Sequence, residues 1–245
     1  MRYRTLIAYD GAAYYGFQRQ CAGQPTIQSE LERALAQITR EAVAVTGSGR
    51  TDSGVHALGQ VVSFTARWQH DVAALQRALN ANLPQDIVVL QVEEASPTFH
   101  PRYDARRRTY AYHIYNAEVR SPLRRLYSWY VSRSLNVDQM QAAAQCLVGT
   151  HDFATFGQPP QGENTVREVF QAGWRQCGDL LVFEITANAF LYRMVRSLVG
   201  SLKAVGEGAW TVDEFAAALR ACDRQRSAAV APACGLYLVS VTYDL

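Results

Sequence analysis

A glycine-rich loop over residues 47–60 places an arginine, an aspartate and a histidine close together in the chain. Its sequence is GSGRTDSGVHALGQ, with four glycines within 13 residues. Glycine permits tight turns and the close approach of a ligand, but it loses more conformational entropy on folding than any other residue. Such a loop is therefore more typical of a functional site than of a segment that only packs against the rest of the fold. The loop contains neither G-x-x-x-x-G-K-[ST] nor G-x-G-x-x-G, so it does not predict a cradle for a nucleoside triphosphate or a dinucleotide.

Arg50 and Asp52 stand two residues apart in this loop. In an extended segment both side chains point the same way, and a nearby guanidinium favours the ionised carboxylate that a nucleophile or base requires. A structural Arg–Asp pair that holds the turn together is the alternative. A third interpretation is a metal-dependent hydrolase with Asp52, His56 and His151 as ligands. The spacing matches neither H-x-x-x-H nor H-E-x-x-H, so we expect no metal site.

A second segment, FHPRYDARRRTYAY over residues 99–112, combines arginines with tyrosines on an expected strand. Guanidinium groups hold RNA phosphates, which makes Arg106, Arg107 and Arg108 candidates for backbone contacts. An aromatic side chain such as Tyr110 stacks on an unpaired base for about 1–3 kcal/mol. The alternative is that Tyr110 and Tyr112 are core-edge aromatics of the kind that strands favour.

The net charge of +2 is unevenly distributed along the chain. Residues 102–133 hold eight arginines against Asp104 and Glu118, a net charge of +6. The residues before this segment carry −1 and those after it −3. Such a basic segment indicates a polyanion as partner. A solvated surface or a set of internal ion pairs is the alternative.

A third cluster lies on a helix that the apolar periodicity predicts over residues 190–205. One polar stripe along this helix contains Arg193, Arg196, Gly200 and Lys203. The stripe is either the solvated face of an amphipathic helix, or it directs one arginine at Asp52 or at a phosphate.

Around these clusters the sequence alternates between strand and helix patterns. Period-two alternation and apolar runs predict strands over residues 2–9, 43–46, 60–64, 87–92, 106–116, 166–175, 180–187 and 236–243. Apolar spacing and capping residues predict helices over residues 26–38, 71–79, 137–147 and 190–205, and one from Thr211. We therefore expect an α+β protein. Pro97 and Pro101 mark a linker, so we expect an N-terminal lobe over 1–102 and a C-terminal lobe over 103–245.

The composition narrows the cellular setting. Apolar residues make up 49% of the chain and charged residues 19%, as in folded globular proteins. No stretch approaches the roughly 18 consecutive apolar residues of a membrane span, and the N-terminus lacks the apolar core of a secretory signal, so no membrane partner is expected. Five scattered cysteines without a C-x-x-C disfavour a disulfide framework and a zinc site. We expect a cytoplasmic protein.

Five motifs in this order resemble the tRNA pseudouridine synthase A (TruA) family. The resemblance begins with YDGAAYYGFQRQ at residues 9–20 and extends almost to the last residue. Ser53 stands where alanine is common in this family. The motifs are GSGRTDSGVHALGQVVSF (47–64), FHPRYDARRRTYAYHIYN (99–116), GTHDFATF (149–156), NAFLYRMVRSLVG (188–200) and APACGLYLVSVTY (231–243).

The resemblance implies a pseudouridine synthase fold, with two α+β lobes whose largely antiparallel sheets flank a basic catalytic cleft. It implies an isomerase that converts uridine to pseudouridine at positions 38, 39 or 40 of the anticodon stem-loop of tRNA. It also implies a homodimer that grips one tRNA across both subunits. The reaction changes no oxidation state and transfers no phosphate, so no cofactor and no metal are expected.

The same resemblance assigns roles to individual residues. Asp52 matches the catalytic aspartate, and Arg50 is its neighbour in the motif. Tyr110 matches the tyrosine that packs on the target base, and Arg196 matches the arginine that pairs with the catalytic aspartate. Leu238 would help to wall the pocket. The target uridine has to leave its stack, which costs a few kcal/mol. A non-catalytic RNA-binding module that uses the arginine–tyrosine strand is the alternative, and it leaves the loop around Asp52 without a role.

Overall fold

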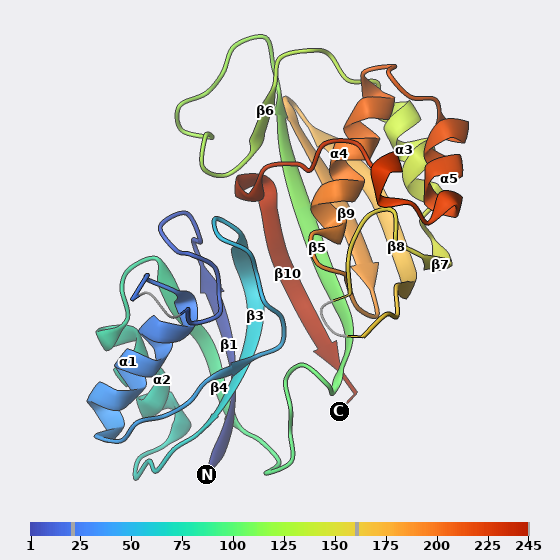
Figure 1. Ribbon diagram of the computed structural model, residues 1–245. Coiled ribbons are helices and arrows are strands. Elements are labelled where there is room, and N and C mark those ends of the chain that lie inside the picture. The colour runs from blue at the N-terminus through green and yellow to red at the C-terminus, as the bar shows by residue number, and fades with distance from the viewer. Residues whose placement is uncertain (21–22, 160–161, 245) are drawn as a thin grey trace. The chain divides into compact units, whose positions relative to one another are not determined.

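Figure 1 shows the computed structural model, which describes residues 1–20, 23–159 and 162–244. The chain divides into two compact units: Met1–Arg106 together with Tyr237–Leu245, and Arg107–Leu236. The last strand is thus grouped with the N-terminal elements, whereas we expected it in a lobe over 103–245. The reason is that this strand pairs with a strand of the first unit through Tyr237 and Leu238.

The described strands of the first unit form one sheet around β1. Their order is β4 (Ile87–Glu94), β1 (Arg2–Tyr9), β3 (His56–Thr65) and β10 (Leu236–Tyr243), and β2 (Thr46–Gly47) pairs with β3. β1 is antiparallel to both of its neighbours, while β10 is parallel to β3. Alternate side chains of β1 are buried, as the period of a strand requires when one face is covered.

Two helices of this unit, α1 (Ile27–Thr39) and α2 (Val72–Asn82), lie side by side (Figure 1). Thr26 caps α1 by accepting a hydrogen bond from the backbone of Ser29, and Asp71 caps α2 in the same way. Each cap satisfies a backbone N–H that has no partner within its helix. Both caps and both helices confirm the sequence prediction.

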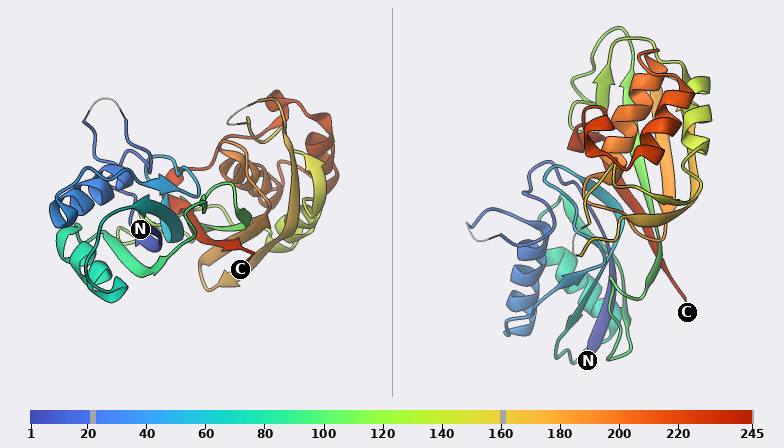
Figure 2. Two further views of the ribbon diagram at one scale, coloured as in Figure 1. Left: turned by 90° about the horizontal axis from the view of Figure 1, so that it is seen from below. Right: turned by 45° about the vertical axis from the view of Figure 1, so that its right-hand side comes forward.

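The second unit has an antiparallel sheet with helices on one face (Figure 2). The strand order is β5 (Ala105–Asn116), β9 (Leu180–Ala187), β8 (Val166–Cys177) and β7 (Gly149–Asp152), and the short β6 (Trp129–Val131) lies parallel to β5. The helices are α3 (Val137–Gln145), α4 (Met194–Gly206) and α5 (Val212–Ala221). Tyr112 and Ile114 of β5 and Phe183 and Ile185 of β9 are fully buried. The expected α+β class is confirmed, with one parallel strand pair in each unit among otherwise antiparallel pairs.

Three expected element boundaries are wrong. The helix expected from residue 190 begins at Met194, because Arg193 adopts the left-handed conformation with φ 59°. The strand expected over 60–64 begins at His56, because Ala57 already pairs with Tyr9 and Leu238. The loop that carries Asp52 is therefore shorter than expected. The strand expected over 43–46 is reduced to the two residues of β2.

In the described ranges no helix is long and apolar enough to cross a membrane. Cys21 lies outside the described residues, and so do residues 160 and 161 of the loop expected over 157–164. The other four cysteines are free thiols.

Candidate functional site

The loop that carries Asp52 is fixed through its neighbour Thr51. The Thr51 hydroxyl is buried and makes a hydrogen bond of 2.8 Å with the hydroxyl of Tyr9, and the Thr51 carbonyl accepts from the backbone N–H of Phe17 at 3.1 Å. The Val55 N–H donates to the Asp52 carbonyl at 3.2 Å, which closes a turn. Asp52 itself is half-buried. The backbone on either side of Asp52 is thus held in place.

The segment from Gly11 to Phe17 packs backbone against backbone on this loop. The Tyr14 carbonyl accepts from the hydroxyl of Ser53 at 3.1 Å. Gly16 has a φ of +88°, and a Cβ built on it would lie 2.6 Å from the Thr51 carbonyl oxygen. A Cβ on Gly11 would lie 2.0 Å from the Val55 carbonyl oxygen. Both positions need glycine because no side-chain carbon fits between the two backbones.

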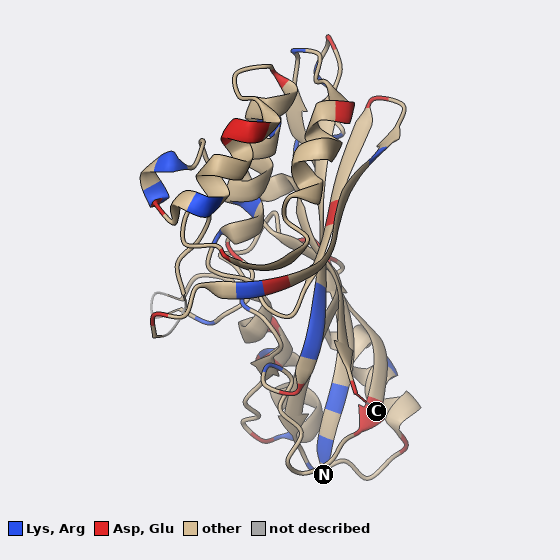
Figure 3. Ribbon diagram, turned by 90° about the vertical axis from the view of Figure 1, so that its right-hand side faces the viewer, with Lys and Arg blue, Asp and Glu red and all other residues tan. Residues whose placement is uncertain are grey.

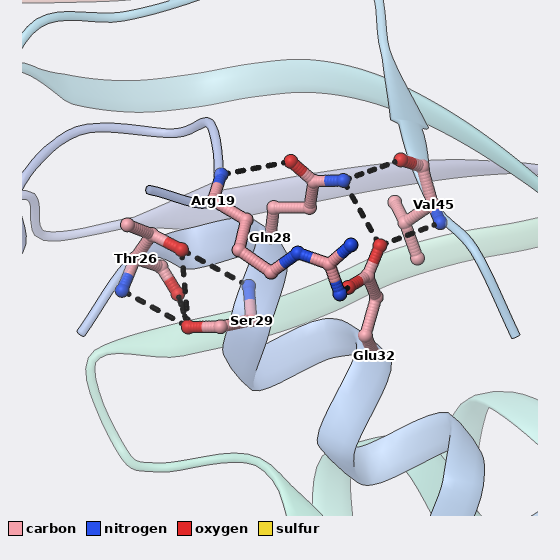
Figure 4. A network of polar contacts seen from close by, with 6 residues as sticks. All are labelled: Arg19, Thr26, Gln28, Ser29, Glu32 and Val45. Carbon is pink, nitrogen blue, oxygen red and sulfur yellow. Dashed lines mark hydrogen bonds and ion pairs between the residues drawn. The ribbon is translucent and has the colours of Figure 1, made fainter. Parts of the chain in front are cut away.

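A second network ties the segment after Phe17 to α1 (Figure 4). The Gln28 side-chain carbonyl accepts from the Arg19 N–H at 2.9 Å, and its amide donates to Glu32 at 2.9 Å and to the Val45 carbonyl at 3.0 Å. Glu32 also accepts from the Val45 N–H and pairs with the Arg19 guanidinium, each at 3.1 Å. The chain that leads into the loop and the segment that supports it are therefore anchored to the same helix.

Gln60 holds the first half of the loop from inside the sheet. Its side chain is fully buried, accepts a short hydrogen bond from the Ser48 hydroxyl and donates to the Gly49 carbonyl at 2.9 Å. The Ser48 N–H donates to the Val61 carbonyl at 2.8 Å. We did not predict this role for Gln60. The sequence does contain a sign of it, because Gln60 is an amide residue next to the apolar Val61, Val62 and Phe64 of one strand.

His56 belongs to the same support. Its Nδ1 accepts from the Gly11 N–H at 3.1 Å and lies 3.0 Å from a carboxylate oxygen of Asp10, while its ring stacks on Tyr237 at 4.8 Å. His151, the third residue of the hydrolase interpretation, lies in the second unit, with Nε2 3.0 Å from the Val148 carbonyl oxygen. Among the described residues no group of three or more His, Cys, Asp and Glu side chains is arranged to hold a metal ion. The hydrolase interpretation has no ligand set in that part of the chain.

Arg50 is exposed at the start of the loop. The alternative of a structural pair between Arg50 and Asp52 stays a prediction. Leu238 lies on β10 of the same unit, fully buried and paired with Ala57.

Tyr110 lies on β5 of the second unit, opposite Ile185. Its ring packs edge-to-face on Phe190, with the ring centroids 5.0 Å apart, and 9% of its surface remains exposed. Tyr112 differs from it: its side chain is completely buried and its hydroxyl donates to the Pro232 carbonyl at 2.8 Å. Burial raises the pKa of the Tyr112 hydroxyl far above its ordinary value. Tyr112 is thus a fully enclosed core residue, and Tyr110 is buried except for this remaining 9%.

Arg196 lies in the first turn of α4 and binds a neighbouring segment. Its Nε donates to the Ala231 carbonyl at 2.7 Å, and the Ala231 N–H donates back to the Arg196 carbonyl at 3.1 Å. A Cβ on Gly200, one turn further, would lie 1.9 Å from the Ala229 carbonyl oxygen. Residues 229–231 thus cover the polar stripe at Arg196 and Gly200, whereas Arg193 at its start is exposed, so only part of the stripe is a solvated face.

The three consecutive arginines of β5 differ in their surroundings and form a continuous blue band in Figure 3. Arg106 is exposed and pairs with Asp244 at 2.6 Å. Arg107 is exposed and lies over the ring of Phe170, 4.3 Å from its centroid. Arg108 is half-buried and donates to the Asn188 carbonyl at 2.9 Å. Arg106 and Arg107 thus keep their charge at the surface, while Arg108 is tied to the chain before α4.

The candidate residues are divided between the units. The first unit carries Arg50, Asp52, Arg106 and Leu238, and the second carries Arg107, Arg108, Tyr110 and Arg196. A hollow of about 440 Å³ between α3 and β8 is lined by none of them. Its lining includes Gln141, which accepts a hydrogen bond from the Trp174 N–H of β8, and Gln145, which donates one to the Ala172 carbonyl of the same strand.

Comparison with known proteins gives one consistent result. A sequence profile of the tRNA pseudouridine synthase family matches residues 6–104 and 143–244. A protein of Rhizobium meliloti named tRNA pseudouridine synthase A is 43% identical over 248 residues, covering 99% of both chains. One of the same name from an Exiguobacterium species is 41% identical over 244 residues, covering 99% of this chain and 98% of the relative.

A Thermoanaerobacter relative with that name is 40% identical over 239 residues, covering 97% of this chain and 98% of its own. A chain in the crystal structure of a Cbf5–Nop10–Gar1 complex covers 82% of this chain and 54% of its own at 12% identity, and its TM-score of 0.33 is too low to bear on fold or function. The chain belongs to the tRNA pseudouridine synthase family. It is an isomerase, and the expectation drawn from its motifs is confirmed.

Proposed function

We propose that this enzyme converts uridine to pseudouridine at positions 38, 39 or 40 in the anticodon stem-loop of tRNA, with Asp52 as the nucleophile. The observation that carries the proposal is the Asp52 loop. A half-buried carboxylate stands on a backbone that buried contacts from Tyr9, Phe17 and Gln60 hold in place. An arrangement of this kind preorganises a reacting group, because the group needs no rearrangement when the substrate arrives.

The reaction defines what the residues have to do. The bond between ribose C1′ and uracil N1 breaks, the base turns, and a new bond forms between C1′ and C5. The C5 proton leaves and N1 gains a proton, so the isomerisation balances without an oxidant, a reductant or a phosphate donor. In this reaction the ionised Asp52 carboxylate is the nucleophile. It forms a temporary covalent bond to the substrate while the base is detached from C1′.

Arg196 is the proposed charge partner of Asp52, and Tyr110 the proposed platform for the target base. A guanidinium offsets the desolvation of a carboxylate that is covered by substrate. The Tyr110 ring is held by its edge-to-face contact with Phe190, which orients it in advance for stacking on a base. Stacking offsets part of the few kcal/mol that flipping the uridine out of its stem costs.

The remaining roles follow from the resemblance. The two units are proposed to face each other across a basic cleft that holds the tRNA, with Arg50 beside Asp52 and Leu238 in the wall of the pocket. Arg106, Arg107 and Arg108 are the proposed contacts to the RNA backbone, and the exposed charges of the first two support this role. A homodimer that acts in the cytoplasm, where tRNA is found, completes the proposal.

The proposal is tested with tRNA transcripts that carry uridine labelled with tritium at C5. Three transcripts hold a single uridine at position 38, 39 or 40, and a control transcript has cytidine at all three positions. We expect tritium release from one or more of the three and none from the control. Tight binding without release from any of them would favour a non-catalytic RNA-binding module.

A further inference from the structure

The connection between β5 and β6 carries arginines of the basic segment over residues 102–133 that have no individual role so far. Arg120, Arg124 and Arg125 lie in this connection and Arg133 follows β6, and all four side chains are exposed. In Figure 1 the connection extends well beyond the end of β5. It is an ordered turn, because the Arg124 N–H donates to the Ser121 carbonyl at 3.2 Å and the Ser128 hydroxyl donates to the Arg124 carbonyl at 3.0 Å.

Within the described part of the chain, none of these four arginines pairs with a carboxylate. The exposed Arg19, Arg33 and Arg106 have an acidic partner, whereas Arg220 and Arg226 are exposed without an ion pair in the described residues; the connection is distinguished by three exposed arginines within residues 120–125. The one acidic residue of the connection is Glu118. A cluster of unpaired cations on one surface creates a positive potential that attracts an anionic partner.

Two of the arginines are held in position. The Arg124 guanidinium lies over the ring of Tyr115, 5.3 Å from its centroid, and Arg125 donates to the Pro122 carbonyl at 2.9 Å. Tyr127 is 41% exposed beside them. Guanidinium groups that are positioned in advance lose less side-chain entropy on binding a phosphate.

A second copy of the chain is the other occupant to consider, since Val119 and Leu123 expose 73% and 84% of their surface on the same connection. A twofold interface places the same surface on both sides. It would bring the arginines of the two copies together, and like charges across an interface are unfavourable. The charge pattern therefore favours a polyanion.

We propose that Arg120, Arg124, Arg125 and Arg133 form a second RNA-binding surface, which holds the tRNA backbone several nucleotides away from the target uridine. The proposal rests on the proposed function for the identity of the RNA. Tyr110 and the end of β5 at Asn116 are separated by six residues of one strand, which is about 20 Å. Contacts at the connection would thus fix the body of the tRNA while the base is held at Tyr110.

The test is the double variant Arg124→Glu/Arg125→Glu, with Arg220→Glu/Arg226→Glu as matched control. The control arginines are exposed, lie in the same unit and change the net charge equally. Binding of an unlabelled tRNA transcript is measured against salt concentration. We expect about tenfold weaker binding and a salt dependence of log K that is shallower by about 1.5, since each lost phosphate contact removes about 0.7–0.9. Arg124→Lys/Arg125→Lys should bind like the wild type, which separates lost charge from a disturbed turn.

Equal salt slopes for the double variant and the control would overturn the proposal. The oligomeric state of the double variant is measured by sedimentation without RNA. Dissociation of an oligomer on charge reversal would also overturn the proposal, because it would assign the surface to a second copy of the chain. Tritium release by the wild type is measured in parallel. Absence of tritium release would contradict the proposed function. The salt dependence of tRNA binding alone tests whether the connection is a second RNA-binding surface.

Discussion

The Asp52 loop and the arginine-bearing surface of the second unit are built in opposite ways. Two buried hydrogen bonds between side chains, one from the Gln60 amide to the Gly49 carbonyl, and two glycines that admit no Cβ fix the loop around the half-buried Asp52. The arginines of β5 and of the connection after it are mostly exposed, and several of them pack on a single ring or bond a single carbonyl at the surface. Bond-making requires atoms placed to within about half an ångström, whereas attraction between guanidinium groups and phosphates falls off slowly with distance. We therefore expect changes near the loop to act on the rate and changes in the arginines to act on affinity.

Gly16→Ala should give the largest effect. The added Cβ would meet the Thr51 carbonyl oxygen at 2.6 Å in a left-handed backbone, so the chain before Asp52 has to move. We expect a loss of about 2–4 kcal/mol in the free energy of unfolding and a fall in the rate of tritium release of more than 100-fold. Gly208→Ala is the control, because it has a φ of +74° with nothing within 4 Å of its Cβ. Denaturant unfolding should show only about 1 kcal/mol for the control, and equal losses would contradict the role of the close approach.

Gln60→Leu should come next. It removes the amide that bonds the Ser48 hydroxyl and the Gly49 carbonyl, and the loss of such a partner costs about 1–3 kcal/mol. We expect kcat to fall about tenfold or more with little change in tRNA affinity. Gln76→Leu is the matched control, since Gln76 also donates to backbone carbonyls in the first unit, those of Val89 and Leu90. A similar fall in kcat for both variants would show that Gln60 acts through general stability alone.

Tyr9→Phe should have a smaller effect of the same kind. The variant removes the hydroxyl that bonds Thr51 and keeps the ring, so we expect a loss of about 1 kcal/mol and a fall of severalfold in kcat. Tyr243→Phe removes a hydroxyl that bonds the Pro101 carbonyl in the same unit and should leave kcat unchanged. Steady-state kinetics under saturating tRNA separate the two, and an unchanged kcat for Tyr9→Phe would mean that the loop does not need this bond.

Arg107→Gln should have the smallest effect and should act on binding. One exposed cation over Phe170 is lost, so the salt dependence of log K is expected to become shallower by somewhat less than 1, with the rate at saturation unchanged. Arg175→Gln, another exposed arginine of the same unit, is the control. A change in the saturated rate without a change in slope would place Arg107 with the loop and not with the RNA-binding residues.

The sequence is informative where a signal is local. The alternation of residues 2–9 and the capping residues Thr26 and Asp71 predict β1, α1 and the start of α2, whereas α2 continues to Asn82, three residues past its expected end. The left-handed Arg193 has no comparable signal; it directly follows Tyr192, which pairs with Gln158 from another part of the chain. The parallel pairing of β10 with β3 has none either, since it joins Tyr237 to His56 across most of the chain.

The site shows the same division. Asp52, Tyr110 and Arg196 stand in motifs that a reader can find in the sequence. The residues that support Asp52 cannot be found in this way, because Tyr9 meets Thr51 over a separation of 42 residues. Only the fold brings such pairs together. The buried amide of Gln60 in an apolar strand is the one local sign that we did not use.

The central claim is that Asp52 performs the chemistry and is not needed to hold the RNA. It is tested most directly by tritium release from tRNA labelled at C5 of uridine, comparing the wild type with Asp52→Asn and measuring tRNA affinity for both. The variant keeps the shape of the side chain and loses its charge. We predict a rate at least about 10³-fold lower, with tRNA affinity within about twofold of the wild type. Release near the wild-type rate, or a loss of affinity as large as the loss of rate, would contradict the account.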